Sequence, residues 1–265
     1  MKDSAWQNPG DHNWLGVWTL YMREVRRFTK IYTQTMLAPV VTTLLFLAVF
    51  SLVIGARSNH LVGGVTFLEF LVPGLIMMAI AQNAFGNTSS SIVVAKIQGN
   101  IVDTLMPPFS ADELTLAIAF GGVTRGIAVG FCVSLAMSVF IPTNLHNLAF
   151  IAFHGFMASL MLSLLGLIAG IWSVKFDHIA AVTNFVVTPL SFLSGTFYSI
   201  HQLPNFAQSI AHLNPFFYMI DGFRYGFIGA SDTDPVLGLV VMVGINILLW
   251  VVCRHMFQVG YKLRA

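Results

Sequence analysis

The sequence predicts an all-α integral membrane protein with six transmembrane helices. The 265-residue chain is 56% hydrophobic and only 9% charged, and its mean hydropathy is +0.78. A soluble domain carries about 25% charged residues, so this chain has too few charges to keep a water-exposed surface wet. Six apolar runs are each long enough for the roughly 20 residues that cross the hydrocarbon core. The absence of charged stretches and the number of these runs therefore set the fold class.

Residues 1–34 are predicted to form a cytoplasmic N-terminus that ends in an amphipathic helix. From residue 14 to residue 32, one stripe at three- and four-residue spacing holds Trp14, Val17, Trp18, Tyr21, Val25, Phe28 and Tyr32, and the opposite stripe holds Arg23, Arg26, Arg27 and Lys30. An aromatic face opposed to a basic face is typical of a helix in the membrane surface. The alternative is a helix that packs on a partner.

The remaining residues, 35–265, are predicted to form one transmembrane domain. The expected spans are 35–56, 67–94, 114–140, 148–174, 179–200 and 236–253. Glycines recur every four residues at Gly122, Gly126 and Gly130, and again at Gly166 and Gly170. Small residues at this spacing let helix backbones approach closely, so these glycines predict helix–helix contacts.

The positions of lysine and arginine predict the orientation. With the N-terminus inside, the cytoplasmic positions are Lys2, Arg23, Arg26, Arg27, Lys30, Lys96, Lys175, Arg254, Lys262 and Arg264. Only Arg57 and Arg224 fall outside, and Arg125 lies within the third span. The positive-inside rule therefore predicts a multi-pass protein with both termini in the cytoplasm.

The segment from Lys96 to Glu113 is the main polar break on the cytoplasmic side. Pro107 and Pro108 should end a short helix that starts at about residue 95, because proline removes a backbone donor. Ser110 should then cap the next span, with Glu113 completing a capping box. A short helix between two spans can act as a lever, and the alternative is an ordinary loop.

A second unusual region, 199–230, lies before the last span. It is too apolar for a free loop and too interrupted to cross the membrane. We expect two short re-entrant helices at the external face, covered by protein. Asp221 and Arg224 are three residues apart and can pair on one helix face.

Polar residues inside the spans are candidates for a translocation path. Span two carries Asn83, Asn87 and Ser90, and span five carries Asn184, Thr188 and Ser191 at similar spacing. These stripes could line a polar path or form interhelical hydrogen bonds.

Arg125 is the only cation within a span. A charge at mid-membrane is costly, so it should contact an anionic substrate or pair with a carboxylate such as Glu69 or Asp112.

No catalytic constellation, metal-ligand cluster or phosphate-binding G-x-x-x-x-G-K-[ST] loop is present in the sequence. We therefore expect neither catalytic residues nor a metal site. This favours transport or scaffolding over enzymology.

Four stretches in this order resemble the permease subunits of ABC-2 type ABC transporters, which are bacterial exporters. These stretches are FLEFLVPGLIMM (67–78), KIQGNIVDTLMPPFSADEL (96–114), FLSGTFYSIHQLP (192–204) and LNPFFYMIDGFRYGFIG (213–229). The resemblance covers nearly the whole chain. It is strongest to the group that exports polysaccharide or nodulation lipo-oligosaccharide.

The resemblance implies a homodimer in the bacterial inner membrane, in contact with lipid and not with nucleic acid. Two copies of a separate ATPase would bind the ATP, and the permease itself would need no cofactor. Residues 95–107 would be the coupling helix, with the ATPase contacted by Lys96, Ile97, Asn100, Ile101, Asp103, Thr104 and Leu105. Helices in 199–230 would gate the outer mouth through Phe216, Phe217, Tyr218, Asp221 and Arg224.

The cargo expected from the resemblance is a polysaccharide, a lipid-linked saccharide or a hydrophobic drug-like molecule. Two alternatives stay open at this point. One is an integral-membrane enzyme that acts on lipid-linked sugars. The other is a membrane scaffold with no transport cycle.

Overall fold

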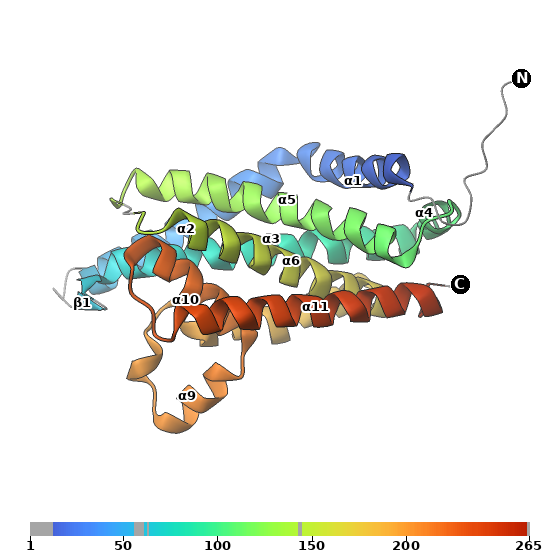
Figure 1. Ribbon diagram of the computed structural model, residues 1–265. Coiled ribbons are helices and arrows are strands. Elements are labelled where there is room, and N and C mark those ends of the chain that lie inside the picture. The colour runs from blue at the N-terminus through green and yellow to red at the C-terminus, as the bar shows by residue number, and fades with distance from the viewer. Residues whose placement is uncertain (1–12, 56–60, 63, 143–144, 264–265) are drawn as a thin grey trace, which may run out of the picture.

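The protein is a bundle of long helices that run side by side (Figure 1). The computed structural model describes residues 13–55, 61–62, 64–142 and 145–263. The first twelve residues of the predicted N-terminal region, which include Lys2, lie outside these residues, as do Arg57 and Arg264. The short helix α4 and the C-terminus lie at one end of the bundle, the α4 end, and the strand pair lies at the other, the β end.

Most of the described residues are helical. The α-helices are α1 (Trp14–Thr29), α2 (Ala38–Phe50), α3 (Phe67–Ile97), α4 (Ile101–Leu105), α5 (Ala111–Ser138), α6 (Leu148–Trp172), α7 (Phe176–Val182), α8 (Thr188–Ser191), α9 (Asn205–His212), α10 (Pro215–Ile228) and α11 (Pro235–Val259). Four π-helical turns, Thr33–Leu37, Ser51–Gly55, Thr183–Val187 and Phe192–Thr196, and a 3₁₀ turn, Ile200–Gln202, complete the helical elements of the described chain. Strands β1 (Leu61–Val62) and β2 (Val65–Thr66) pair antiparallel.

In the described part of the chain, six helical stretches are long and apolar enough to cross a membrane, as the sequence predicts. They are Thr33–Val53, Phe67–Ile97, Ala111–Ser138, Leu148–Trp172, Phe176–Thr196 and Pro235–Val259. The last stretch ends six residues later than expected, where Gly260 adopts a left-handed conformation with φ 67°. In the first and fifth stretches, π-helical turns directly precede the short helices that contain Pro39 and Pro189. Proline interrupts helical hydrogen bonding, which accounts for irregular turns at these places.

Helix α1 packs along α5, and its apolar face is divided between the protein and the surroundings. Val17, Leu20 and Phe28 are buried, whereas Trp14 and Trp18 are more than half exposed. The basic stripe was predicted to face anionic lipid, but Arg23 and Arg27 of this stripe pair with Glu24, which is buried on the same helix. The contacts of these charges are described below.

The sequence predicted one short helix from about residue 95 to the prolines, but the structure shows two separate helices here. Helix α3 continues to Ile97, and α4 begins only at Ile101. The break occurs at Gly99, where φ is +75°, a conformation that ends helices and that glycine adopts at little cost. The capping box at the start of α5 is confirmed. The Ser110 amide donates to Glu113 Oε2 at 2.7 Å, and the Glu113 amide donates to Ser110 Oγ at 3.2 Å.

Helix α3 is the centre of the bundle, and α5 and α6 pack on it. An added Cβ at Gly126 would lie 3.0 Å from the Ala84 Cβ, and one at Gly166 would lie 2.5 Å from the Phe85 carbonyl oxygen. The predicted role of the spaced glycines in helix packing is therefore confirmed. At Gly166 the α3 backbone itself is the close neighbour, so there is no room for a larger residue.

We expect Gly166→Ala to destabilise the protein by about 1–3 kcal/mol, because the new methyl group would push α6 away from the α3 backbone. The matched control is Gly244→Ala in α11, where an added Cβ meets no atom within 4 Å. Thermal unfolding in detergent measures both effects. Equal midpoints for the two variants would show that the α3–α6 contact is not tight.

Candidate functional site

A cavity of about 510 Å³ lies between the first span, α3 and α5, and Arg125 reaches it from the middle of α5. Its lining includes three residues predicted to form the path, Asn83, Ser90 and Arg125. Polar residues of the first span, Gln34, Thr35, Thr42 and Thr43, line it too and were not predicted. The four-residue repeat of Gln34, Ala38 and Thr42 was the available signal, because it places these residues on one helix face.

Arg125 reaches the cavity from α5 and forms no ion pair within the described part of the chain. Its Nη2 donates to Asn83 Oδ1 at 3.0 Å, and its buried Nε has no hydrogen-bond partner. The expected carboxylate partners are engaged elsewhere. Glu69 accepts a hydrogen bond from the Thr66 amide at 2.9 Å, and Asp112 pairs with Arg254 at 3.4 Å.

The prediction that Arg125 pairs with Glu69 or Asp112 is therefore wrong. Arg125 and Asp112 are both in α5, thirteen residues apart, which is about 20 Å along a helix. No side chain spans that distance. Arg125 is instead a cation held by a neutral amide at the wall of a cavity.

A buried carboxylate that the sequence analysis did not single out connects α1 to the bundle. Glu24 is 1% exposed and pairs with Arg27 at 3.2 Å and with Arg23 at 3.3 Å. Its backbone approaches α5 closely, since a Cβ added at Gly121 would lie 2.5 Å from the Glu24 Cβ. The signal in the sequence was one acidic residue on an otherwise basic helix.

The two arginines beside Glu24 bind different parts of the protein. Arg27 donates from Nη2 to the Asn87 carbonyl at 2.6 Å and from Nη1 to Ser90 Oγ at 3.2 Å. Arg23 donates from Nη1 to Thr104 Oγ1 in α4 at 2.9 Å. Burial lowers the pKa of Arg27, and the opposing charge of Glu24 raises it. The trio therefore connects α4, through α1, to the wall of the cavity.

Asn87 was predicted to line the path, but it is fully buried and does not line the cavity. Its side-chain oxygen accepts from Arg27 Nη2 at 3.0 Å. The residue holds α1 against α3.

The predicted coupling residues divide into an inner and an outer set. Ile101 and Thr104 are buried, and the Lys96 Nζ donates to the carbonyl oxygens of Ile171 and Ser173 at the end of α6. Ile97, Asn100 and Asp103 are exposed, whereas Leu105 is half-buried. Two exposed apolar side chains, Val102 and Met106, belong to the outer set and were not predicted. A lysine can donate to the free carbonyl groups at a helix C-terminus. Lys96 of α3 does this at the end of α6, so its role within the chain is structural.

The polar residues of the fifth span do not meet this cavity within one chain. Asn184 is exposed, Thr188 is half-buried, and the buried Ser191 donates to the carbonyl of Val187 in its own helix at 2.8 Å. None of the three lines the cavity. Their role in a path remains a prediction.

The apolar region before the last span forms the two short helices α9 and α10, and the two differ in how they lie against the bundle. Helix α9 projects from the bundle, whereas α10 lies among the long helices (Figure 1). Phe216, Phe217 and Tyr218 of α10 are buried. The Tyr218 hydroxyl donates to the His212 carbonyl at 2.9 Å, which ties α10 to the end of α9.

Asp221 and Arg224 are both buried, but they do not form the ion pair that their spacing allows. Asp221 accepts from the amides of Asp232 and Thr233 and from the hydroxyls of Ser231 and Thr233, at 2.7–3.2 Å. Arg224 donates from Nη2 to the Gly195 carbonyl at 2.5 Å, and its guanidinium carbon lies 3.8 Å from the centroid of the Phe70 ring. The two charges instead anchor α10 to separate segments, the loop before α11 and the start of α3.

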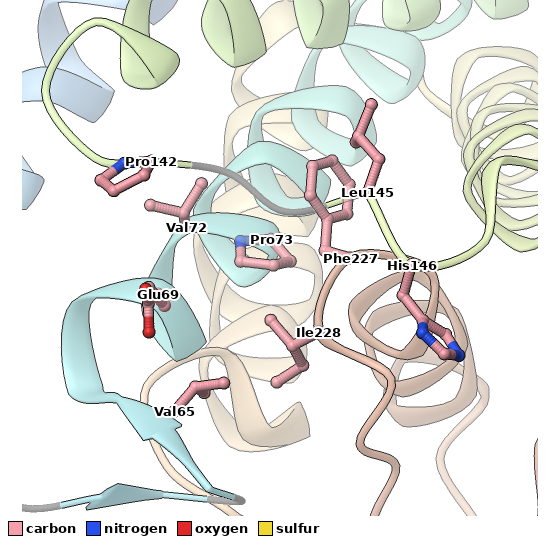
Figure 2. Close-up of a pocket in the computed structure, with 9 residues that line it drawn as sticks. All are labelled: Val65, Glu69, Val72, Pro73, Pro142, Leu145, His146, Phe227 and Ile228. Atoms are coloured by element: carbon pink, nitrogen blue, oxygen red, sulfur yellow. The ribbon is translucent and has the colours of Figure 1, made fainter.

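A second hollow, of about 340 Å³, lies at the β end beside α10. Figure 2 shows Glu69 and His146 on opposite sides of it, with Pro73 and Phe227 between them. Most of its lining is apolar. The C-terminal end of α10 therefore forms part of the wall of this hollow.

We expect Arg27→Met to destabilise the protein by about 3 kcal/mol, because it leaves Glu24 buried without its inner partner. Arg23 is half exposed, so Arg23→Met should cost no more than about 1 kcal/mol. The double variant Glu24→Gln/Arg27→Met should recover part of the loss. Thermal unfolding in detergent is the measurement. Equal losses of stability for Arg23→Met and Arg27→Met would contradict the claim that Arg27 is the more important partner of Glu24.

Comparison with known proteins assigns the family. The family model described as "ABC-2 type transporter" matches residues 16–228. The chain is 38% identical to the inner membrane transport permease YadH of Escherichia coli K12 over 252 residues, which is 95% of this chain and 98% of YadH. It is 26% identical to nodulation protein J of Rhizobium leguminosarum bv. viciae over 247 residues, 89% of this chain and 88% of that protein.

Permeases of this family work with a partner ATPase subunit, and these relatives are named for transport or nodulation and not for catalysis. The match spans α1, the first five membrane-crossing stretches, the coupling segment and α10. The chain belongs to the ABC-2 type transporter family and is a permease subunit of an ABC transporter.

Proposed function

We propose that the chain exports cargo across a bacterial inner membrane, as a homodimer driven by two copies of a separate ATPase. Both termini and the α4 end face the cytoplasm, and the β end faces outward. The inner-membrane location agrees with the printed name of YadH. The observation that carries the proposal is an exposed apolar surface on the segment that joins α3 to α5.

This surface, the coupling face, consists of Ile97, Val102, Asp103 and Met106. Val102 is 51% exposed and Met106 is 75% exposed, although both lie in the segment between two membrane-crossing helices and not within a span. Apolar side chains gain little by facing water, and the segment lies outside the apolar spans. A groove of the ATPase would cover these side chains. Asp103 would pair with a cation of the ATPase and so fix the position of the coupling face in that groove.

Helix α1 and the coupling segment behave as one mechanical unit in this proposal. Arg23 binds Thr104, the Asn13 amide donates to Glu113 Oε1 at 2.7 Å, and a Cβ at Gly16 would lie 2.6 Å from the Phe109 ring. Helix α1 leads into the first span four residues later. A push on α4 is therefore expected to move the first span and α3, and both line the cavity.

The translocation path would run from this cavity along the fifth span, between two copies of the chain. Asn184 is exposed in one chain, and a polar side chain is unfavourable against lipid. In the first span, Leu37, Val41, Leu45 and Val49 form an exposed apolar stripe, which a second copy or lipid would cover. Asn184, Thr188 and Ser191 would then face the path in the dimer.

The outer end of the path would be closed by α10. Its aromatic residues are buried against the bundle, and its two charges are each held by a separate segment. Opening would require these contacts to shift together. Phe216, Phe217, Tyr218, Asp221 and Arg224 thus form a gate in this proposal.

The names of the relatives suggest a broad class of cargo. Nodulation protein J is named for nodulation, and the chain matches most of its length. A polysaccharide, a lipid-linked saccharide or a hydrophobic drug-like molecule would fit a path with both polar and aromatic residues. An enzyme acting on lipid-linked sugars and a scaffold without transport are less well supported, because YadH is named a transport permease.

The coupling face can be tested with the double variant Val102→Ser/Met106→Ser. Loss of two apolar contacts from an interface should lower the amount of ATPase that copurifies with the permease by about tenfold or more. The matched control is Phe206→Ser/Leu213→Ser, which removes two exposed apolar side chains from the insert around α9. Undiminished copurification in the first variant, or equal loss in both, would count against this face.

A further inference from the structure

We propose that the cavity beside Arg125 binds the anionic headgroup of an amphipathic cargo. The inference rests on the proposed function, because it takes this cavity as part of the export path. It adds the chemistry of the ligand: a phosphate or carboxylate group attached to an apolar chain. Arg125 is the residue that contacts the anion.

The first argument is the unbalanced charge of Arg125. Its guanidinium carries five N–H donors, and the structure assigns one hydrogen bond, to Asn83. Its Nε is buried without a partner, and no carboxylate lies within ion-pair distance in the described parts of the chain. A cation within a span is costly unless a counter-charge or water compensates it. An arriving anion would supply that compensation and would be held in a bidentate manner.

The second argument is the charge around the cavity. Arg27 lies within electrostatic reach of Arg125 and donates to Ser90, which lines the cavity. Glu24 balances only one of its two partners, Arg23 and Arg27. Arg23, Arg27, Arg125 and Glu24 together carry a net charge of +2. Such a field attracts anions from the cytoplasmic side.

The third argument is the rest of the lining, which is neutral and mixed. Gln34, Thr42 and Gln82 offer hydrogen bonds, whereas Ile31, Pro39 and Met78 are apolar, and no carboxylate is among the lining residues. A volume of about 510 Å³ is within the range of small-molecule sites and is larger than a free phosphate needs. The lining therefore fits a headgroup together with the first part of its chain.

The test uses the full-length permease in nanodiscs of neutral phosphatidylcholine, with and without its ATPase. Dodecyl phosphate is titrated as the anionic amphiphile, dodecyl maltoside as the neutral one with the same chain, and inorganic phosphate as the free anion. Binding is followed by the shift in thermal unfolding. The variants are Arg125→Gln, Arg125→Lys and the control Arg26→Gln, which removes an exposed arginine of α1 outside the cavity.

We expect dodecyl phosphate to bind at least tenfold more tightly than the other two ligands. Arg125→Gln should lower the ratio of anionic to neutral affinity about tenfold, Arg125→Lys should keep most of it, and Arg26→Gln should change it less than twofold. Equal binding of the two amphiphiles, or an equal loss of both in Arg125→Gln, would overturn the proposal. Equally tight binding of inorganic phosphate would overturn the requirement for a chain. Copurification of the ATPase is scored separately, so a failure of the export proposal is distinguishable from a failure of this site.

Discussion

The structure depends on how charges are compensated in a protein that has few of them. Glu24 is the clearest case, because it is 1% exposed and lies between Arg23 and Arg27. A buried charge without a partner is strongly destabilising, so the three side chains have to stay together. Since Arg23 reaches α4 and Arg27 reaches α3, the cost of separating these charges fixes the position of α1 on the bundle.

The same principle distinguishes structural charges from a functional one. Asp221 is buried and accepts hydrogen bonds from the loop before α11. The buried Arg224 donates to the Gly195 carbonyl and lies over the Phe70 ring, so both residues anchor α10 to neighbouring segments. Lys96 satisfies carbonyls at the end of α6. Arg125 differs because it lines a cavity and is held only by an amide. Its place at the cavity wall is the basis of the proposed binding site for an anion.

The fold was largely predictable, because apolar runs, spaced glycines and capping residues are local signals. The predicted span starts at residues 67 and 148 agree with the structure, and so does the capping box of Ser110 and Glu113. The site was less predictable, because its partners are distant in sequence. Arg125 was recognised as a candidate, but its neighbour could not be chosen among Asn83, Glu69 and Asp112 without the packing of α3 on α5. Glu24 was overlooked because an acidic residue on a basic helix usually faces solvent.

The central claim is that α1 and the coupling segment move as one body when the partner ATPase binds ATP. Spin labels on exposed positions test it most directly, with one pair at Thr19 and Asn100 and a second pair at Thr19 and Leu213, in a background without Cys132 and Cys253. The account predicts that ATP leaves the Thr19–Asn100 distance unchanged and alters the Thr19–Leu213 distance. A change between Thr19 and Asn100 as large as that between Thr19 and Leu213 would contradict it.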